Sequence, residues 1–181
     1  MRIISGKYKG RGLKMPKGIR PTQNKVRKAV FDILGDIQGE SFLELFAGSG
    51  AVGIEALSQG AKQVVFVEND THCLRILEDN LSRILPANYY LLSMDYSRAI
   101  KELTGKKFKF DVIFLDPPYY NELARKTLQM LCACDILSPC GYIVAQHFKK
   151  DNLPDAVGDL ILFKQNCYGD TVLTFYKKCA K

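Results

Sequence analysis

The ten residues Glu44–Gly53 read ELFAGSGAVG, and they decide the fold expected for this 181-residue chain. A β-rich run precedes them and a helix-like run follows. Gly48, Gly50 and Gly53 satisfy the pattern GxGxxG, in which glycines let the backbone turn tightly and approach a ligand at the carboxyl end of the first strand. The stretch therefore predicts the nucleoside-cofactor loop of a doubly wound α/β domain.

Short β-rich runs alternate with helix-like runs downstream of this loop, at spacings typical of βαβ units. Five residues, Asn166–Asp170, separate the last two runs, so these strands must pair as an antiparallel hairpin, whereas the earlier strands should be parallel. The seven expected strands are Ser41–Phe46, Val64–Glu68, Tyr89–Met94, Asp111–Leu115, Tyr142–Gln146, Asp159–Gln165 and Thr171–Lys177, and the helices between the first five lie near Val52–Gln59, Asp70–Leu85, Ser97–Leu103 and Glu122–Ala133. The expected fold is a Rossmann-like, doubly wound α/β domain with a mostly parallel seven-stranded sheet and a C-terminal antiparallel hairpin, spanning residues 39–181.

Residues 1–38 should form a small basic unit packed on this core. Arg2–Met15 resembles a glycine-bearing hairpin, and Thr22 is placed to cap a helix. Residues 1–28 carry ten basic side chains and no acidic one, whereas the rest of the chain carries 16 basic and 19 acidic residues. Such asymmetry indicates a partner with a phosphate backbone, although a solubilising tail is the alternative. The side chains expected to follow that backbone are Lys7, Lys9, Arg11 and Lys14.

Composition narrows the class of protein further. Hydrophobic residues make up 47% and charged residues 25%, as in an ordinary globular domain, and the apolar runs are far shorter than a membrane span. The start of the chain shows no signal-peptide pattern, so a cytoplasmic location is expected. Six cysteines are scattered without a CxxC pair, and only two histidines are present. We therefore expect reduced, mostly buried thiols and no metal site.

Carboxylates at the ends of consecutive strands identify the cofactor. Glu68 follows Gly48 by twenty residues and is placed to accept ribose hydroxyls, while Asp95 ends the third strand, where the adenine amine would lie. Glu44 would repel a pyrophosphate and attract the ammonium and sulfonium of S-adenosylmethionine. The chain also lacks a Tyr-x-x-x-Lys pair for hydride transfer. The residues expected to bind S-adenosylmethionine are Glu44, Phe46, Gly48, Gly50, Glu68, Asn69 and Asp95.

The motif Asp116-Pro117-Pro118-Tyr119 ends the fourth strand, beside the expected cofactor loop. An exocyclic amine of a base is a poor nucleophile because its lone pair is delocalised into the ring. The Asp116 carboxylate and the Pro117 carbonyl could accept its two hydrogens and direct the lone pair at a methyl group. The prolines fix the backbone, and Tyr119 offers a face on which a flipped base stacks. These four residues are the expected catalytic site.

Several motifs together resemble the RsmD family. They are Phe46-Ala47-Gly48-Ser49-Gly50, Asp116-Pro117-Pro118-Tyr119, the leader Arg20-Pro21-Thr22 with Val26-Arg27, and Tyr168-Gly169-Asp170-Thr171. The resemblance runs from Arg2 to Lys177. It implies a class I methyltransferase fold and N2-methylation of a guanine in small-subunit (16S) ribosomal RNA of bacteria. It also implies that Arg20 and Thr22 lie near the RNA, with Arg27 counted among the RNA-binding residues. Gln23, Asn24 and Lys28 replace more acidic residues that are common in the family.

Three other functions remain open from the residues alone. The cofactor loop and the Asp-Pro-Pro-Tyr motif are shared with enzymes that methylate adenine N6. A nicotinamide-dependent oxidoreductase would share the glycines and Glu68, and a non-catalytic RNA-binding module would share the basic arm. We expect a monomer whose partners are RNA and S-adenosylmethionine, without a membrane or a metal.

Overall fold

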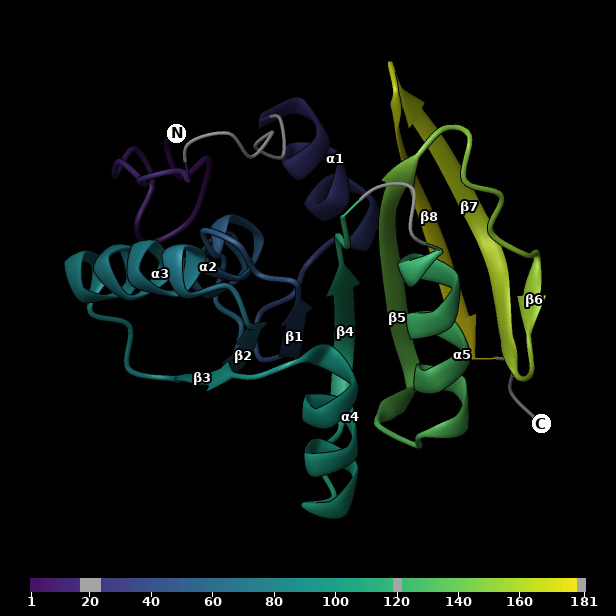
Figure 1. Ribbon diagram of the computed structural model, residues 1–181. Helices are drawn as coiled ribbons and strands as arrows, with labels where there is room; N and C mark the ends of the chain where they lie inside the picture. Colours follow the sequence, from purple (N-terminus) through teal and green to yellow (C-terminus); the bar gives the residue numbers. More distant parts are fainter. Residues whose placement is uncertain (17–23, 119–121, 179–181) are drawn as a thin grey trace.

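Eight strands form one sheet in the order β3-β2-β1-β4-β5-β8-β7-β6 (Figure 1). The computed structural model describes residues 1–16, 24–118 and 122–178. The strands are β1 Ser41–Leu45, β2 Gln63–Glu68, β3 Tyr89–Ser93, β4 Phe110–Leu115, β5 Leu137–Phe148, β6 Ala156–Val157, β7 Leu160–Tyr168 and β8 Thr171–Lys178. The first five are parallel, and the last three add in antiparallel fashion. The strand order reverses between β1 and β4, so the crevice at their carboxyl ends is the place where such sheets bind ligands.

Helices cover both faces of this sheet. They are α1 Asn24–Leu34, α2 Ala51–Ser58, α3 Thr71–Ile84, α4 Tyr96–Gly105 and α5 Leu123–Ala133. Helices α1, α2 and α3 share one buried cluster with Phe42 and Phe114, whereas α4 and α5 share the other with Leu43 and Ile113. Adjacent strand residues thus enter opposite cores, because side chains alternate along a strand. Burial on both faces explains the continuous apolar runs Val64–Val67 in β2 and Val112–Leu115 in β4.

The expected fold class is confirmed, with two differences in detail. The prediction of seven strands was wrong by one, because Ala156–Val157 pairs with the start of β7 as an additional edge strand. Two residues before Gly158 are too few to give a period-two pattern in sequence. The expected N-terminal hairpin is a loop, residues 1–14, closed by a single bridge between Arg2 and Gly12. Its turns at Gly6 and Gly10 leave no continuous ladder.

This N-terminal loop packs on α2 and α3 (Figure 1). The Lys7 amide donates to the Ser58 carbonyl at 2.7 Å, and the Lys14 amide donates to Asn80 Oδ1 at 2.8 Å. Asn80 returns the contact by donating to the Lys14 carbonyl at 3.0 Å. Since Asn80 is fully buried, these bonds fix the loop on the domain rather than leaving it as a tail.

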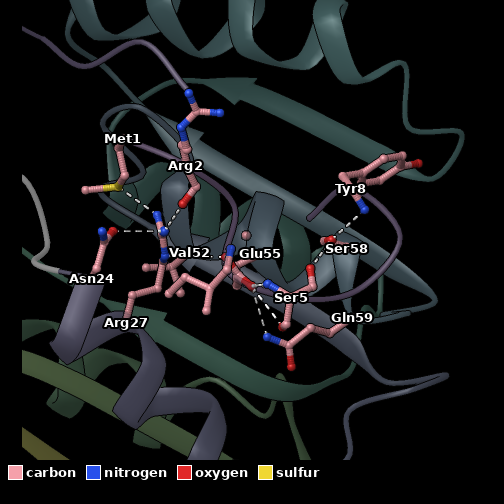
Figure 2. Close-up of polar contacts among 12 residues, drawn as sticks. Met1, Arg2, Ser5, Tyr8, Asn24, Arg27, Val52, Glu55, Ser58 and Gln59 are labelled. Atoms are coloured by element: carbon pink, nitrogen blue, oxygen red, sulfur yellow. Dashed lines mark hydrogen bonds and ion pairs between the residues drawn. The ribbon is translucent and has the colours of Figure 1, made fainter. Parts of the chain in front are cut away.

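Arg27 corrects one expectation about the basic residues. Its side chain is fully buried between α1, α2 and the N-terminal loop, so it does not offer a surface for RNA. Figure 2 shows its guanidinium donating to the carbonyl of Arg2 and to Asn24 Oδ1, and facing Glu55 as an ion pair at 3.5 Å. The buried Glu55 carboxylate also accepts the Ser5 amide at 2.8 Å. A basic residue within a basic run is usually exposed, so the sequence favoured a surface position for Arg27. Its acidic partner, Glu55, lies 28 residues further along the chain, where the local pattern does not reveal it.

Two findings concern the remaining expectations from composition. Among the described residues, no helix is long and apolar enough to cross a membrane, and no cluster of three or more His, Cys, Asp or Glu side chains is arranged to hold a metal ion. The five described cysteines are unpaired. The expectation that they are mostly buried was wrong, because only Cys73 is buried, while Cys140 and Cys167 are exposed.

Candidate active site

The loop between β1 and α2 has the tight turns that its glycines predicted. Gly48 and Gly50 have φ angles of +55° and +74°, and Phe46 adopts φ +59°, a conformation that costs a residue with a side chain about 1–3 kcal/mol. A Cβ atom on Gly50 would lie 2.2 Å from Leu77 Cδ1, whereas one on Gly48 would meet nothing within 4 Å. Gly50 is therefore required by packing, while Gly48 faces open space where a ligand can approach.

Glu68 connects this loop to the end of β2. Its Oε2 accepts the Gly48 amide at 2.7 Å, and its Oε1 accepts the amides of Asn69 and Asp70 at 2.8 and 2.9 Å. The twenty-residue spacing between Gly48 and Glu68 is thus a direct contact in the structure. Since Oε2 has a second acceptor direction, Glu68 can bind a ligand hydroxyl while it holds the loop.

A pocket at the ends of β1, β2 and β3 brings together four of the expected cofactor residues. Its lining consists of Phe46, Val67, Glu68, Asn69, Met94, Asp95 and Tyr96. The Phe46 and Tyr96 rings lie 5.0 Å apart, and Asp95 caps α4 by accepting the Ser97 amide at 2.8 Å. Met94 and Tyr96 were missed from the sequence, although both flank Asp95 at the strand end that was singled out.

Glu44 lies behind the loop rather than in this pocket. It is 3% exposed, and its carboxylate accepts the Gly53 amide at 2.9 Å and the Val52 amide at 3.3 Å at the start of α2. Burial raises the pKa of Glu44 to about 8, against the effect of these hydrogen bonds, and the nearby charges of Asp116 and Glu68 add to the rise. Glu44 is therefore largely protonated at neutral pH, and a cationic cofactor bound nearby would favour its ionised form.

Asp116 follows β4 at the other side of the same crevice. The parallel register pairs Leu115 with Ala145, so the next residues, Asp116 and Gln146, lie beside each other. Gln146 Nε2 donates to Asp116 Oδ2 at 2.7 Å. Gln146 was missed from the sequence, because its position depends on the register of two strands that are distant in the chain. Tyr119 lies outside the described residues.

A cavity of about 270 Å³ adjoins the proline pair. It lies between Pro117–Pro118, the start of α5 and the segment after β5. Arg125 on α5 and Lys150 after β5 contribute basic groups to its lining. His147 lines its inner side, and burial lowers the pKa of this imidazole. The cavity is large enough for a base, so the catalytic motif has space beside it for a substrate.

The basic side chains of the N-terminal loop are at the surface. Lys7, Lys9, Arg11 and Lys14 are all exposed, and the cations of Lys7 and Arg11 lie over the Tyr8 ring at 5.4 and 5.3 Å. Lys14 also pairs with Asp79 at 3.3 Å. These four side chains can meet a phosphate backbone, whereas Arg20 and Thr22 lie outside the described residues.

Comparison with known proteins gives a family. The profile of the family described as "Conserved hypothetical protein 95" matches residues 1–177. The chain belongs to this family.

The chain is 38% identical over 182 residues to the Bacillus subtilis protein named "Putative rRNA methyltransferase YlbH", covering 98% of this chain and 99% of that one. It is 29% identical over 184 residues to Escherichia coli "Ribosomal RNA small subunit methyltransferase D", covering 100% of this chain and 91% of that one. The solved structure titled "Putative methyltransferase yhhF from Escherichia coli" superposes with a TM-score of 0.87 at 30% identity, over 100% of this chain and 99% of that one. The resemblance to the RsmD family is thereby confirmed, and so is the methyltransferase fold.

The residues present fit S-adenosylmethionine. Gly48 leaves room for close approach, Glu68 offers an acceptor for a hydroxyl, and Asp95 lies in the pocket beside the rings of Phe46 and Tyr96. The carboxylates nearby suit a ligand with two positive charges and disfavour a pyrophosphate.

Proposed function

We propose that this chain is an S-adenosylmethionine-dependent methyltransferase that modifies the exocyclic N2 amine of a guanine in small-subunit (16S) ribosomal RNA. The observation that carries the proposal is the position of Asp116, at the switch point of a methyltransferase sheet and across the crevice from the Gly48–Glu68 contact. The printed names of the Bacillus and Escherichia relatives support ribosomal RNA as the substrate.

The proposed mechanism assigns one task to each side of the crevice. S-adenosylmethionine supplies, when bound, a methyl group on a positively charged sulfur. Glu68 and the pocket around Asp95 hold and orient it. Asp116, fixed by Gln146, accepts a hydrogen bond from the target amine and stabilises the positive charge that develops on nitrogen. As the N–C bond forms and the S–C bond breaks, Asp116 takes the proton that the nitrogen loses, and S-adenosylhomocysteine is the leaving product. Pro117 offers its carbonyl to the second hydrogen, so the nitrogen lone pair is aimed along the line of transfer.

The N-terminal loop supports RNA as the partner of this site. Exposed basic side chains are concentrated in this loop, whereas the rest of the chain is nearly neutral. Hydrogen bonds to Ser58 and Asn80 fix the loop on α2 and α3. A fixed basic surface can orient a phosphate backbone relative to the crevice, whereas a free tail would only increase solubility. A location in the cytoplasm, where ribosomes assemble, is part of the proposal.

Nucleoside analysis of methylated RNA tests the proposal. Purified protein, labelled S-adenosylmethionine and unmodified 16S ribosomal RNA should yield N2-methylguanosine on digestion and mass spectrometry. The Asp116→Ala variant serves as the negative control. Recovery of N6-methyladenosine instead would establish the adenine alternative, and the absence of any methylated nucleoside would reject the proposal.

A salt series tests the role of the loop. Replacing Lys7, Lys9, Arg11 and Lys14 with Gln should flatten the plot of log affinity against log salt by about two to three units, at about 0.7 for each phosphate that the variant no longer binds. The matched control neutralises Lys101, Lys106, Lys107 and Lys109, which are exposed on and after α4, on the other face of the sheet. Equal slopes for the two variants and the wild type would identify the loop as a solubilising element only.

A further inference from the structure

Gln146 carries a buried acceptor for which the described residues offer no partner. The side chain is 4% exposed, and its Oε1 forms no hydrogen bond there. Leaving a buried carbonyl oxygen unpaired costs about 1–3 kcal/mol, so such a group calls for an explanation. It lies next to the expected site of chemistry, because the same amide donates to Asp116.

Asp116 determines which way the amide faces. A carboxylate only accepts hydrogen bonds, so the Gln146 NH2 group must be directed at Asp116 Oδ2, and the opposite orientation would place two oxygens against each other. Oε1 is bonded to the same carbon as Nε2. The bare acceptor is therefore held beside the carboxylate and cannot turn into a donor.

Two adjacent acceptors match one purine edge and not the other. In guanine the N2 amine is flanked by the N1–H donor, so an acceptor beside Asp116 finds a hydrogen. In adenine the N6 amine is flanked by N1 and N7, which carry lone pairs. A buried acceptor facing a lone pair would be repelled and left unpaired, and sites built in this way reject the wrong base strongly.

We propose that Gln146 is a specificity-determining residue that accepts the N1–H of the target guanine through Oε1 while its Nε2 positions Asp116. This inference rests on the proposed function and deepens it. It assigns the choice between guanine and adenine to a residue outside the Asp-Pro-Pro-Tyr motif, which by itself fits either amine.

Base analogues distinguish recognition of the guanine N1–H by Gln146 from methyl transfer itself. The substrate is a ribosomal RNA fragment containing the guanosine identified by nucleoside analysis, or the same fragment with 2,6-diaminopurine or 2-aminopurine riboside at that position. Both analogues retain the N2 amine but present N1 as an acceptor. Wild-type protein should prefer guanosine in kcat/KM by about 100-fold or more. Gln146→Met should reduce this preference to within about fivefold, and the matched control Gln165→Met, an exposed amide that donates to Thr174, should keep it.

Gln146→Glu provides a second variant. In this variant a glutamate lies beside Asp116, and the two carboxylates share a proton only at low pH. When that proton is lost, the two negative charges repel each other. The activity of the variant should therefore fall as pH rises through a range where wild-type activity does not fall. A wild-type enzyme that accepts the analogues as well as guanosine would overturn the inference, as would Gln146→Met and Gln146→Glu variants that are folded and keep the wild-type preference. Failure to methylate any guanosine would instead reject the proposed function.

Discussion

The two sides of the catalytic crevice are held in different ways. On the cofactor side, Glu44 and Asp95 accept backbone amides that follow them closely in the chain. Glu68 does the same and also accepts the Gly48 amide of the preceding loop. On the target side, Asp116 is held by the side chain of Gln146 from a neighbouring strand. The cofactor side is thus built from local chain geometry, whereas the target side depends on how two strands align. A substitution of a single residue on β5 can therefore alter how the target amine is held without altering how the cofactor is bound.

The largest effect is expected from a substitution that changes only the target side of the crevice. Asp116→Ala removes the acceptor for the amine, and we expect turnover to fall about 100- to 1,000-fold, since one such group contributes about 3–4 kcal/mol in the transition state. Affinity for S-adenosylmethionine should stay within about threefold of wild type. Single-turnover methyl transfer and calorimetry measure the two quantities separately, and a parallel loss of both would contradict the division of the crevice.

The next effect compares two glycines of the cofactor loop. Gly50→Ala should reduce the free energy of unfolding by about 2–5 kcal/mol, because left-handed backbone strain adds to the overpacking against the buried Leu77. Gly48→Ala should cost only the strain, about 1–2 kcal/mol, but should weaken S-adenosylmethionine binding because its methyl group occupies open space at the pocket. Urea unfolding and calorimetry on both variants check this, and equal unfolding midpoints would show that packing does not distinguish them.

A smaller loss is expected when the cofactor side loses its carboxylate. Glu68→Ala should weaken S-adenosylmethionine binding by about 1.5–3 kcal/mol, or about 10- to 150-fold, since it removes a charge-assisted bond to the ligand and the anchor of Gly48. Turnover at saturating cofactor should change little. Glu78→Ala, an exposed glutamate on α3, is the matched control. A dissociation constant unchanged by Glu68→Ala would exclude Glu68 from cofactor binding.

The smallest effect concerns the pH dependence of stability. Burial raises the pKa of Glu44 to about 8, so the folded state retains a proton that the unfolded state releases near pH 4–5. This contribution to stability is present at low pH and declines as pH rises toward and through 8. Between pH 7 and 9, wild type should therefore lose more stability than Glu44→Gln, by at most about 1.4 kcal/mol per pH unit. The comparison starts at pH 7 because the lowered pKa of His147 acts on the acid side. Parallel urea-unfolding curves for the two proteins across this range would contradict the assignment.

The sequence predicts which residues of the proposed cofactor side lie close together, and it does so for a physical reason. Its residues follow one another at strand ends, and the carboxyl ends of parallel strands meet at one edge, so linear spacing translates into proximity. Glu68 contacts Gly48 as the twenty-residue spacing indicates. The pattern does not show which way a carboxylate points. Glu44 therefore lies behind the loop, where it stabilises the start of α2, although its charge was expected to face the ligand.

The residues that the sequence did not place depend on tertiary partners. Gln146 acquires its role only when β4 and β5 pair in register. Arg27 is buried because Glu55 on α2 and the carbonyl of Arg2 face its guanidinium, and a charge in a basic run carries no sign of such partners. Strand β6 forms because β7 offers it an edge. For Gln146 and Arg27 the missing information is long-range pairing, which neither periodicity nor composition contains. For β6 it is length, because two residues give no pattern.

The N-terminal loop has a consequence for the order of events during synthesis. Its first residues leave the ribosome before any of their partners, since Ser5 bonds to Glu55 and Lys14 to Asn80, 50 and 66 positions later. Contacts of such long separation close slowly, because the entropy of the intervening chain must be overcome first. The positively charged segment therefore lacks its full set of partners on the nascent chain until α3 has been translated. It completes its packing late, although it precedes those partners in the chain.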